Sequence, residues 1–152
     1  MTTRALILRY ADYKERSRIL TVLTEQGEKL TVTSNGSKAY AEPYVCSELT
    51  LRQSNGRWYA QEGRTVAEFR GIRKDIEKFE LAAYIAKIAE ALSDSDVPQP
   101  ELFRLIARAF DTMSKLEISA DGTTLKRFQK ALEIRIARIA GFVSFDEIRE
   151  IL

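Results

Sequence analysis

The stretch VCSELTLRQSNGRWYAQ, residues 45–61, decides the fold. Its leucines alternate with polar residues, a period of two that is typical of a strand with one buried face. Asn55 and Gly56 then form the strongest short hairpin signal in the chain, because both central positions of a type I′ turn need a positive φ. The stretch therefore predicts an antiparallel hairpin. Trp58 and Tyr59 follow each other on its second strand and should point to opposite faces, one into the core and the other outward.

Further strands lie on both sides of this hairpin. Apolar residues between polar turns predict strands at residues 4–10, 17–24 and 29–34, and a last extended piece follows the hairpin at 65–69. A longer connection separates the third strand from the hairpin. Five principal strands with one long break after the third fit a small Greek-key barrel of the OB type. An SH3-like barrel has similar strand counts and stays open as an alternative.

After Gly71 the apolar period becomes helical. Helices are predicted from residue 72 to 92, over 101–115 and from 123 or 124 to 140, with a final turn at 144–148. The first helix is apolar on two sides, so we expect a strut with Ile76 and Phe79 against the barrel and Ile85 and Ile88 against the other helices. The predicted fold class is α+β with the strands first: a five-stranded OB-type barrel at residues 1–70, then an all-α helical domain at 71–152.

The composition argues against an enzyme. The chain has no histidine and one cysteine, Cys46, which removes the commonest general base, histidine-assisted nucleophiles and a zinc cluster of cysteine and histidine. No phosphate-binding glycine motif occurs. Cys46 sits in an apolar strand, which favours a small buried residue over a nucleophile. We therefore expect a non-catalytic protein without metal or cofactor.

The charged residues are mildly uneven along the chain. Residues 1–70 hold eleven Lys and Arg against eight Asp and Glu, and residues 71–152 hold thirteen against fourteen. This basic character of the first half permits binding to nucleic acid. No apolar run approaches the roughly 18–20 residues that span a bilayer. The apolar stretch near the N-terminus is too short and too charged for a signal peptide, so we expect a cytoplasmic location without membrane contact.

Three stretches resemble the RecO family of recombination mediator proteins. RALILRYADYKERSRIL, residues 4–20, is similar to that family's first hairpin, and TVLTEQGEKL continues it to residue 30. FRGIRKDIEKF, residues 69–79, resembles the family's junction between barrel and first helix. LKRF at 125–128, LE at 132–133 and AGF at 140–142 resemble a later helix and its glycine stop. The similarity covers nearly the whole chain as a diffuse pattern.

The resemblance implies a fold and a role. The fold is an N-terminal OB domain followed by a helical domain. The role lies in DNA repair and recombination: the protein would bind and anneal single-stranded DNA and help to load RecA on strands coated by single-strand-binding protein, often with RecR. A rival hypothesis is a protein-interaction adaptor whose barrel binds a partner protein and not DNA.

Two features depart from the family pattern. Many members carry a four-cysteine zinc cluster shortly after the glycine stop and continue with more helices, whereas this sequence ends there, as expected of a truncated chain or a short member. Many members also have a basic segment after the third strand. Here the corresponding Asn35-Gly36-Ser37-Lys38-Ala39-Tyr40 keeps one lysine.

OB barrels bind oligonucleotides on the face of strands 2 and 3 and with the loops that join strands 1–2 and 4–5. Arg and Lys neutralise phosphates there, and exposed aromatic rings stack on bases. The candidate DNA contacts are Tyr13, Lys14, Arg16, Arg18, Lys29, Lys38 and Arg57. The alternative is a solvated basic face with Tyr13 as a packing residue.

A second basic surface is predicted on the third helix, on the side away from its core stripe. Its members are Lys126, Arg127, Lys130 and Arg138. This surface could extend a path for DNA or receive an acidic tail, and an ordinary solvated helix face is the alternative.

Overall fold

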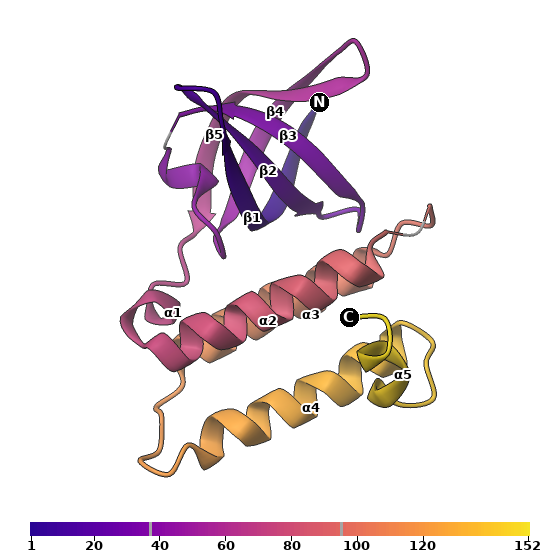
Figure 1. Cartoon of the computed structure of the whole chain (residues 1–152). Coiled ribbons are helices and arrows are strands. Elements are labelled where there is room, and N and C mark those ends of the chain that lie inside the picture. The colour runs from indigo at the N-terminus through magenta and orange to yellow at the C-terminus, as the bar shows by residue number, and fades with distance from the viewer. Residues whose placement is uncertain (37, 95) are drawn as a thin grey trace.

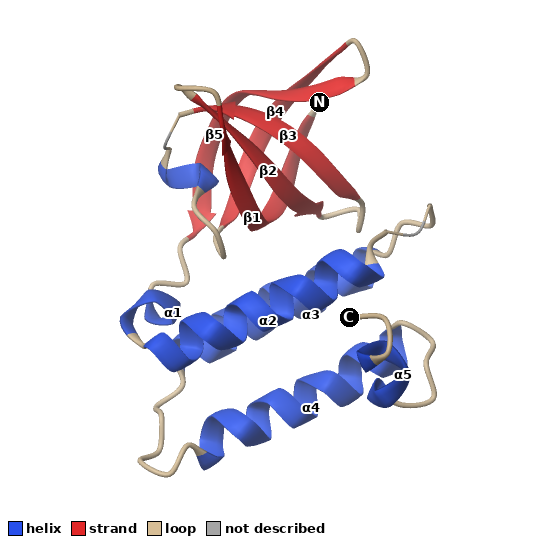
Figure 2. Cartoon of the chain, in the orientation of Figure 1, coloured by secondary structure: helices blue, strands red, loops and turns tan. Residues whose placement is uncertain are grey.

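In the computed structural model (Figures 1 and 2), the chain forms a β-barrel followed by helices. The structure describes residues 1–36, 38–94 and 96–152, so Ser37 of the segment after the third strand lies outside them. Within the described residues the strands are β1 (Thr2–Tyr13), β2 (Ser17–Thr24), β3 (Lys29–Asn35), β4 (Cys46–Ser54) and β5 (Arg57–Ala67). The short 3₁₀ helix η1 (Ala39–Ala41) connects β3 to β4.

The strands close into a barrel in the order β1-β2-β3-β5-β4, with β3 and β5 parallel and the other neighbours antiparallel. This order agrees with the OB type expected from the long break after the third strand. The predicted hairpin is confirmed: Asn55 has φ 52° and Gly56 has φ 76°, and Ser54 pairs with Arg57 across the turn.

The barrel interior is filled from every strand by small and branched apolar side chains. Val32 and Leu49 are fully buried there, and Trp58 packs against them. Tyr59 therefore faces outward, which decides the choice that the sequence left open. The segment containing η1 packs on β5, because the Tyr40 ring lies on Gly63, where a Cβ would lie 2.5 Å from that ring.

Within the described residues, the helices are α1 (Gly71–Lys74), α2 (Ile76–Leu92), α3 (Pro100–Lys115), α4 (Thr123–Ile139) and α5 (Phe145–Arg149). Their positions agree closely with the predicted ranges. α2 and α3 lie side by side beneath the barrel, and α4 lies on their other side with α5 at its end (Figure 1). The result is three layers: barrel, α2 with α3, and α4.

The apolar core continues from the barrel base into the helices. Leu6 and Leu8 of β1 belong to the same buried cluster as Ile85 and Ile88 of α2. Phe110 of α3 is fully buried in this cluster. One apolar cluster therefore crosses residue 70 and joins the barrel base to the helices, and a second cluster fills the barrel interior.

The predicted barrel face of the first helix is wrong at Ile76, whereas Phe79 contacts Tyr44, whose amide donates a hydrogen bond to β1. Ile76 is 75% exposed, and Phe79 is 38% exposed with only a ring edge against Tyr44 at a centroid distance of 5.2 Å. The reason is a break in the helix: Asp75 has φ −127° and ψ 128°, an extended conformation. α1 therefore carries Ile72 separately, and the helical phase restarts at Ile76.

Two glycines permit α3 to approach the rest of the protein closely. A Cβ on Gly27, in the turn between β2 and β3, would lie 2.0 Å from the carbonyl carbon of Gln99 just before α3. A Cβ on Gly71 would lie 1.8 Å from the carbonyl oxygen of Ser114 near the end of α3. The buried Lys78 ammonium donates to the carbonyl oxygen of Leu116 at 2.5 Å and so satisfies a backbone acceptor at that helix end.

Two polar contacts tie the layers together. Arg9 of β1 donates to both carboxylate oxygens of Glu90 in α2, at 2.9 and 2.8 Å. The Tyr84 hydroxyl of α2 donates to the buried Glu133 of α4 at 2.8 Å. Burial and the Glu133 carboxylate raise the pKa of Tyr84 to about 12, so this hydroxyl keeps its proton.

The shared core predicts that barrel and helices unfold together. Phe110 is fully buried, and its ring lies 5.9 Å from the Phe69 ring and 6.0 Å from the Tyr44 ring, centroid to centroid. Phe110→Ala should lower the free energy of unfolding by about 3–5 kcal/mol, because it removes buried apolar surface and leaves a cavity. Thermal unfolding followed by Trp58 fluorescence and by far-ultraviolet circular dichroism should give coincident transitions, both shifted down.

Ile76→Ala is the matched control, because this exposed side chain contributes little to packing. Its transition should stay within a degree or two of the wild type, since exposed substitutions cost about 0.5 kcal/mol or less. A Phe110→Ala variant in which the fluorescence transition stays in place would contradict a shared core.

Candidate nucleic-acid interface

The outer wall of the barrel carries a row of side chains that crosses four strands. The register pairs Ile19 of β2 with Thr33 of β3, Thr33 with Tyr59 of β5, and Tyr59 with Arg52 of β4. Directly paired residues point to the same face of a sheet. Since Trp58, next to Tyr59, points into the barrel, this row lies on the outside.

Tyr59 and Arg52 form the chemically most distinctive part of this row. The Arg52 guanidinium carbon lies 4.9 Å from the centre of the Tyr59 ring, so a cation and an aromatic face sit together on an open strand surface. Neither residue was among the predicted contacts. The alternation of Arg52 with Leu49 and Leu51 indicated its outward direction, but its pairing with Tyr59 depends on the register of the hairpin.

The tip of the β1–β2 hairpin carries a second pair of this kind. The Lys14 ammonium lies 5.2 Å from the centre of the Tyr13 ring, and Tyr13 is 41% exposed. Lys14 adopts φ 59°, a left-handed conformation that closes this tip. Tyr13 pairs with Ser17 of β2, and Ser17 pairs with Asn35 of β3. Ser17 and Asn35 are each two residues away from a member of the row that contains Tyr59, so the tip adjoins that row on the same wall.

The β1–β2 tip also adjoins the start of the β3–β4 connection. The Gly36 amide donates to the Arg16 carbonyl oxygen at 2.6 Å. Lys38 is exposed in the same connection, at the start of η1. The structure therefore brings Lys14, Arg16 and Lys38 to one region of the barrel.

Arg57 lies in the β4–β5 turn and is exposed. This turn and the β1–β2 tip both project from the end of the barrel that is farther from α2 (Figure 2). Over the residues that the structure describes, Lys14, Arg16, Lys38, Arg52 and Arg57 form no ion pair. Their charges are therefore available to an anionic ligand.

Two of the predicted contacts are placed differently. Arg18 is 9% exposed: its guanidinium stacks on the Tyr10 ring at 3.8 Å and pairs with Asp12 at 3.4 Å and Glu42 at 3.5 Å. Lys29 is the first residue of β3, and its ammonium forms an ion pair with Asp94, just after the end of α2. Both charges are thus balanced within the protein.

The second predicted surface lies on α4. Lys126, Arg127, Lys130 and Arg138 are all exposed, and so is Arg135, which was not among the predicted residues of this surface. Glu133 is the only acidic residue of α4 and is buried. The layer of α2 and α3 separates this basic helix from the barrel (Figure 1), so the two basic surfaces are not continuous across the helical layer.

The described residues offer little for other chemistry. They contain no group of three or more His, Cys, Asp or Glu side chains that could hold a metal ion. Cys46 is buried, and burial raises the pKa of its thiol, which disfavours the thiolate. None of the helices in the described part of the chain combines the length and the apolar character that crossing a membrane requires.

Comparison with known proteins supports the resemblance found in the sequence. No protein-family model matches the chain. It is 31% identical to the DNA repair protein RecO of Shouchella clausii over 126 residues, which cover 76% of this chain and 49% of that protein. It is 27% identical to RecO of Bacillus subtilis over 117 residues (72% of this chain, 46% of that protein). It is 28% identical to RecO of Geobacter metallireducens over 152 residues (95% and 60%). The chain spans about half the length of these curated relatives.

Proposed function

Because the chain belongs to the RecO family of DNA repair proteins, we propose that it binds single-stranded DNA on the outer wall of its barrel. The proposed contacts are Tyr13, Lys14, Arg16, Lys38, Arg52, Arg57 and Tyr59. Binding needs no side-chain catalysis, so the protein acts as a mediator that holds and juxtaposes strands. Its proposed wider role is to anneal strands and assist RecA loading, with RecR and single-strand-binding protein as partners.

One observation supports this function best: at two places on one wall, an aromatic ring lies beside a cation. Tyr59 lies beside Arg52, and Tyr13 lies beside Lys14. Single-stranded nucleic acid offers bases that stack on any aromatic face and phosphates that attract Lys and Arg. Such a surface binds without sequence preference, as a repair protein acting at many loci requires.

The charge state of the wall also supports DNA over a protein partner. Arg18 and Lys29, whose charges are already matched by Asp12, Glu42 and Asp94, are left out of the proposed contacts. Within the described residues no ion pair is formed by the proposed basic contacts, which are Lys14, Arg16, Lys38, Arg52 and Arg57. The rival hypothesis, an adaptor whose barrel binds only a partner protein, predicts no salt-dependent affinity for oligonucleotides.

Tyr59→Ala should weaken binding to oligothymidylate by about 1–3 kcal/mol, the contribution of one base stacked on an aromatic ring. Tyr59→Phe is the matched control and should retain the affinity, because the ring is kept and only the hydroxyl is removed. Fluorescence anisotropy with labelled oligothymidylate measures both. Equal affinities for the Ala and Phe variants, with unchanged melting curves, would remove Tyr59 from the site.

The combined substitution of Lys14, Arg16, Lys38 and Arg57 by Ala should flatten the salt dependence of binding. For single strands, the slope of log K against log salt becomes shallower by about 0.7 for each phosphate that the protein no longer neutralises. Substitution of Arg18 and Lys29 by Ala should leave the slope unchanged, because their charges face carboxylates of the protein. If the slope becomes shallower in the Arg18 and Lys29 variant and not in the combined variant, the DNA binds elsewhere on the protein.

The α4 surface is proposed to hold a second strand during annealing. Reversal of Arg127, Lys130 and Arg138 to Glu should slow the annealing of complementary oligonucleotides, which can be followed by energy transfer between two dyes. The affinity of the barrel for oligothymidylate should remain, since α4 lies on the far side of α2 and α3 (Figure 1). Unchanged annealing would make α4 an ordinary solvated helix.

A further inference from the structure

One side of β5 is an open strand edge over most of its length. β5 pairs with β4 from Arg57 to Ala67, but with β3 only at Trp58 and Tyr59. Beyond Tyr59, no other strand of the described chain pairs with this side of β5. An edge of this kind presents backbone N–H and C=O groups that can pair with an added strand.

Two connected cavities run along this edge. The first, of about 540 Å³, lies between the η1 segment and β5 and is lined by Lys38, Tyr40, Glu62 and Arg64 among others. The second, of about 460 Å³, lies where the barrel meets α1. Ala39 and Thr65 line both cavities, so they form one groove, which we name the β5 groove.

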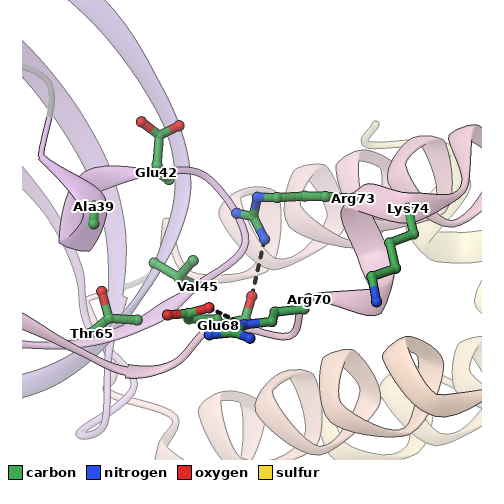
Figure 3. A pocket seen from close by; sticks show the side chains of 8 residues that line it. All are labelled: Ala39, Glu42, Val45, Thr65, Glu68, Arg70, Arg73 and Lys74. Carbon is green, nitrogen blue, oxygen red and sulfur yellow. Dashed lines mark hydrogen bonds and ion pairs between the residues drawn. The ribbon is translucent and has the colours of Figure 1, made fainter.

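The inner part of the β5 groove has an apolar floor and a basic rim (Figure 3). Ala39, Val45 and Thr65 come from the barrel side, and the basic side chains Arg70, Arg73 and Lys74 come from the α1 side. This combination of an apolar base and a few directed charges is characteristic of ligand sites.

The walls of the β5 groove are held in place by contacts within the protein. Arg73 donates to the carbonyl oxygens of Glu68, at 3.0 Å, and of Pro43, which joins α1 to both sides of the groove. The Tyr40 ring lies directly on Gly63 and holds the η1 segment against β5. The groove therefore exists before any ligand binds, which lowers the entropic cost of binding.

The charges along the β5 groove favour a peptide over nucleic acid. Glu42, Glu62 and Glu68 line it together with the basic residues, and this mixture of signs suits a polypeptide better than the uniformly charged backbone of a nucleic acid. At the α1 end, however, Glu68 is already paired with Arg70, while Lys74 forms no ion pair in the described part of the chain. That end is left with a net positive charge.

We propose that the β5 groove binds an extended, acidic peptide segment of a partner protein. The peptide backbone adds a strand to β5 along residues 61–67, and an acidic side chain lies against Lys74 and Arg73 in the inner cavity. Strand addition derives affinity from main-chain hydrogen bonds and specificity from side-chain pockets. Apart from Lys38, which lines the outer cavity, the site shares no residue with the outer wall proposed for DNA, and it does not depend on DNA binding there.

Selection of random nine-residue peptides displayed on phage against the whole chain supplies the probe. We expect enriched sequences to contain Asp or Glu next to alternating apolar residues. A labelled synthetic copy of the strongest sequence should bind about tenfold or more weakly to the Lys74→Glu variant, as removal of a charge pair predicts. The same peptide, N-methylated at alternate positions, should not bind, because its backbone donors are blocked.

Two control variants separate this proposal from the proposed DNA function. The first is the double variant Arg16→Ala/Arg57→Ala, and the second is Lys130→Glu on α4. Both should bind the peptide with wild-type affinity. The proposal is overturned if no acidic sequence is enriched, if affinity survives both Lys74→Glu and N-methylation, or if the α4 variant abolishes binding. None of these outcomes bears on whether the outer wall binds oligothymidylate.

Discussion

The close contact of α3 with the barrel and with α1 is the constraint on which the rest of the structure depends. At Gly27 the turn between β2 and β3 meets the backbone at Gln99, and at Gly71 the start of α1 meets the backbone at Ser114. Both distances leave no room for a Cβ, so the two ends of α3 are fixed to different parts of the chain. This fixes the angle at which the helical layer lies beneath the barrel.

The same contact decides which surfaces of the barrel remain open. The base of the barrel is closed by α2 and α3, whose apolar side chains merge with those of Leu6 and Leu8. Ligands are therefore left with the outer wall, the two projecting turns and the β5 groove. The Arg9–Glu90 ion pair at the edge of the closed base shows that a basic residue near the barrel is not by itself a ligand contact.

The sequence was sufficient for what short-range patterns determine. The alternation over residues 45–61, the Asn55-Gly56 turn and the helical periods after Gly71 predicted the elements and the α+β class. It was insufficient wherever a residue's role depends on a partner far along the chain. Lys29 looked free in sequence, but it pairs with Asp94, and no local pattern could reveal that.

The error about the strut has a different origin. Apolar residues at Ile72, Ile76 and Phe79 fit one helix face only if the helix is continuous. The extended conformation of Asp75 interrupts it, and the residues after the break belong to a helix with a new phase. When a helical period is extended across a break that the sequence does not reveal, residues after the break are assigned to the wrong face of the helix. This happens even when each apolar residue is identified correctly.

The arrangement of charges divides the surface into regions suited to different kinds of ligand. On the outer wall, basic residues lie beside aromatic rings with no carboxylate paired to them within the described residues, which suits a polyanion whose bases stack. Along the β5 groove, carboxylates such as Glu62 and Glu68 lie among basic residues beside a strand edge with which no other described strand pairs beyond Tyr59, which suits a polypeptide. Because β5 carries Tyr59 on its outer face and the groove on its free edge, one strand can serve both ligands. A DNA strand and a partner peptide would then occupy neighbouring surfaces of the barrel, and the rigid attachment of α1 would hold the two sites in a fixed relation.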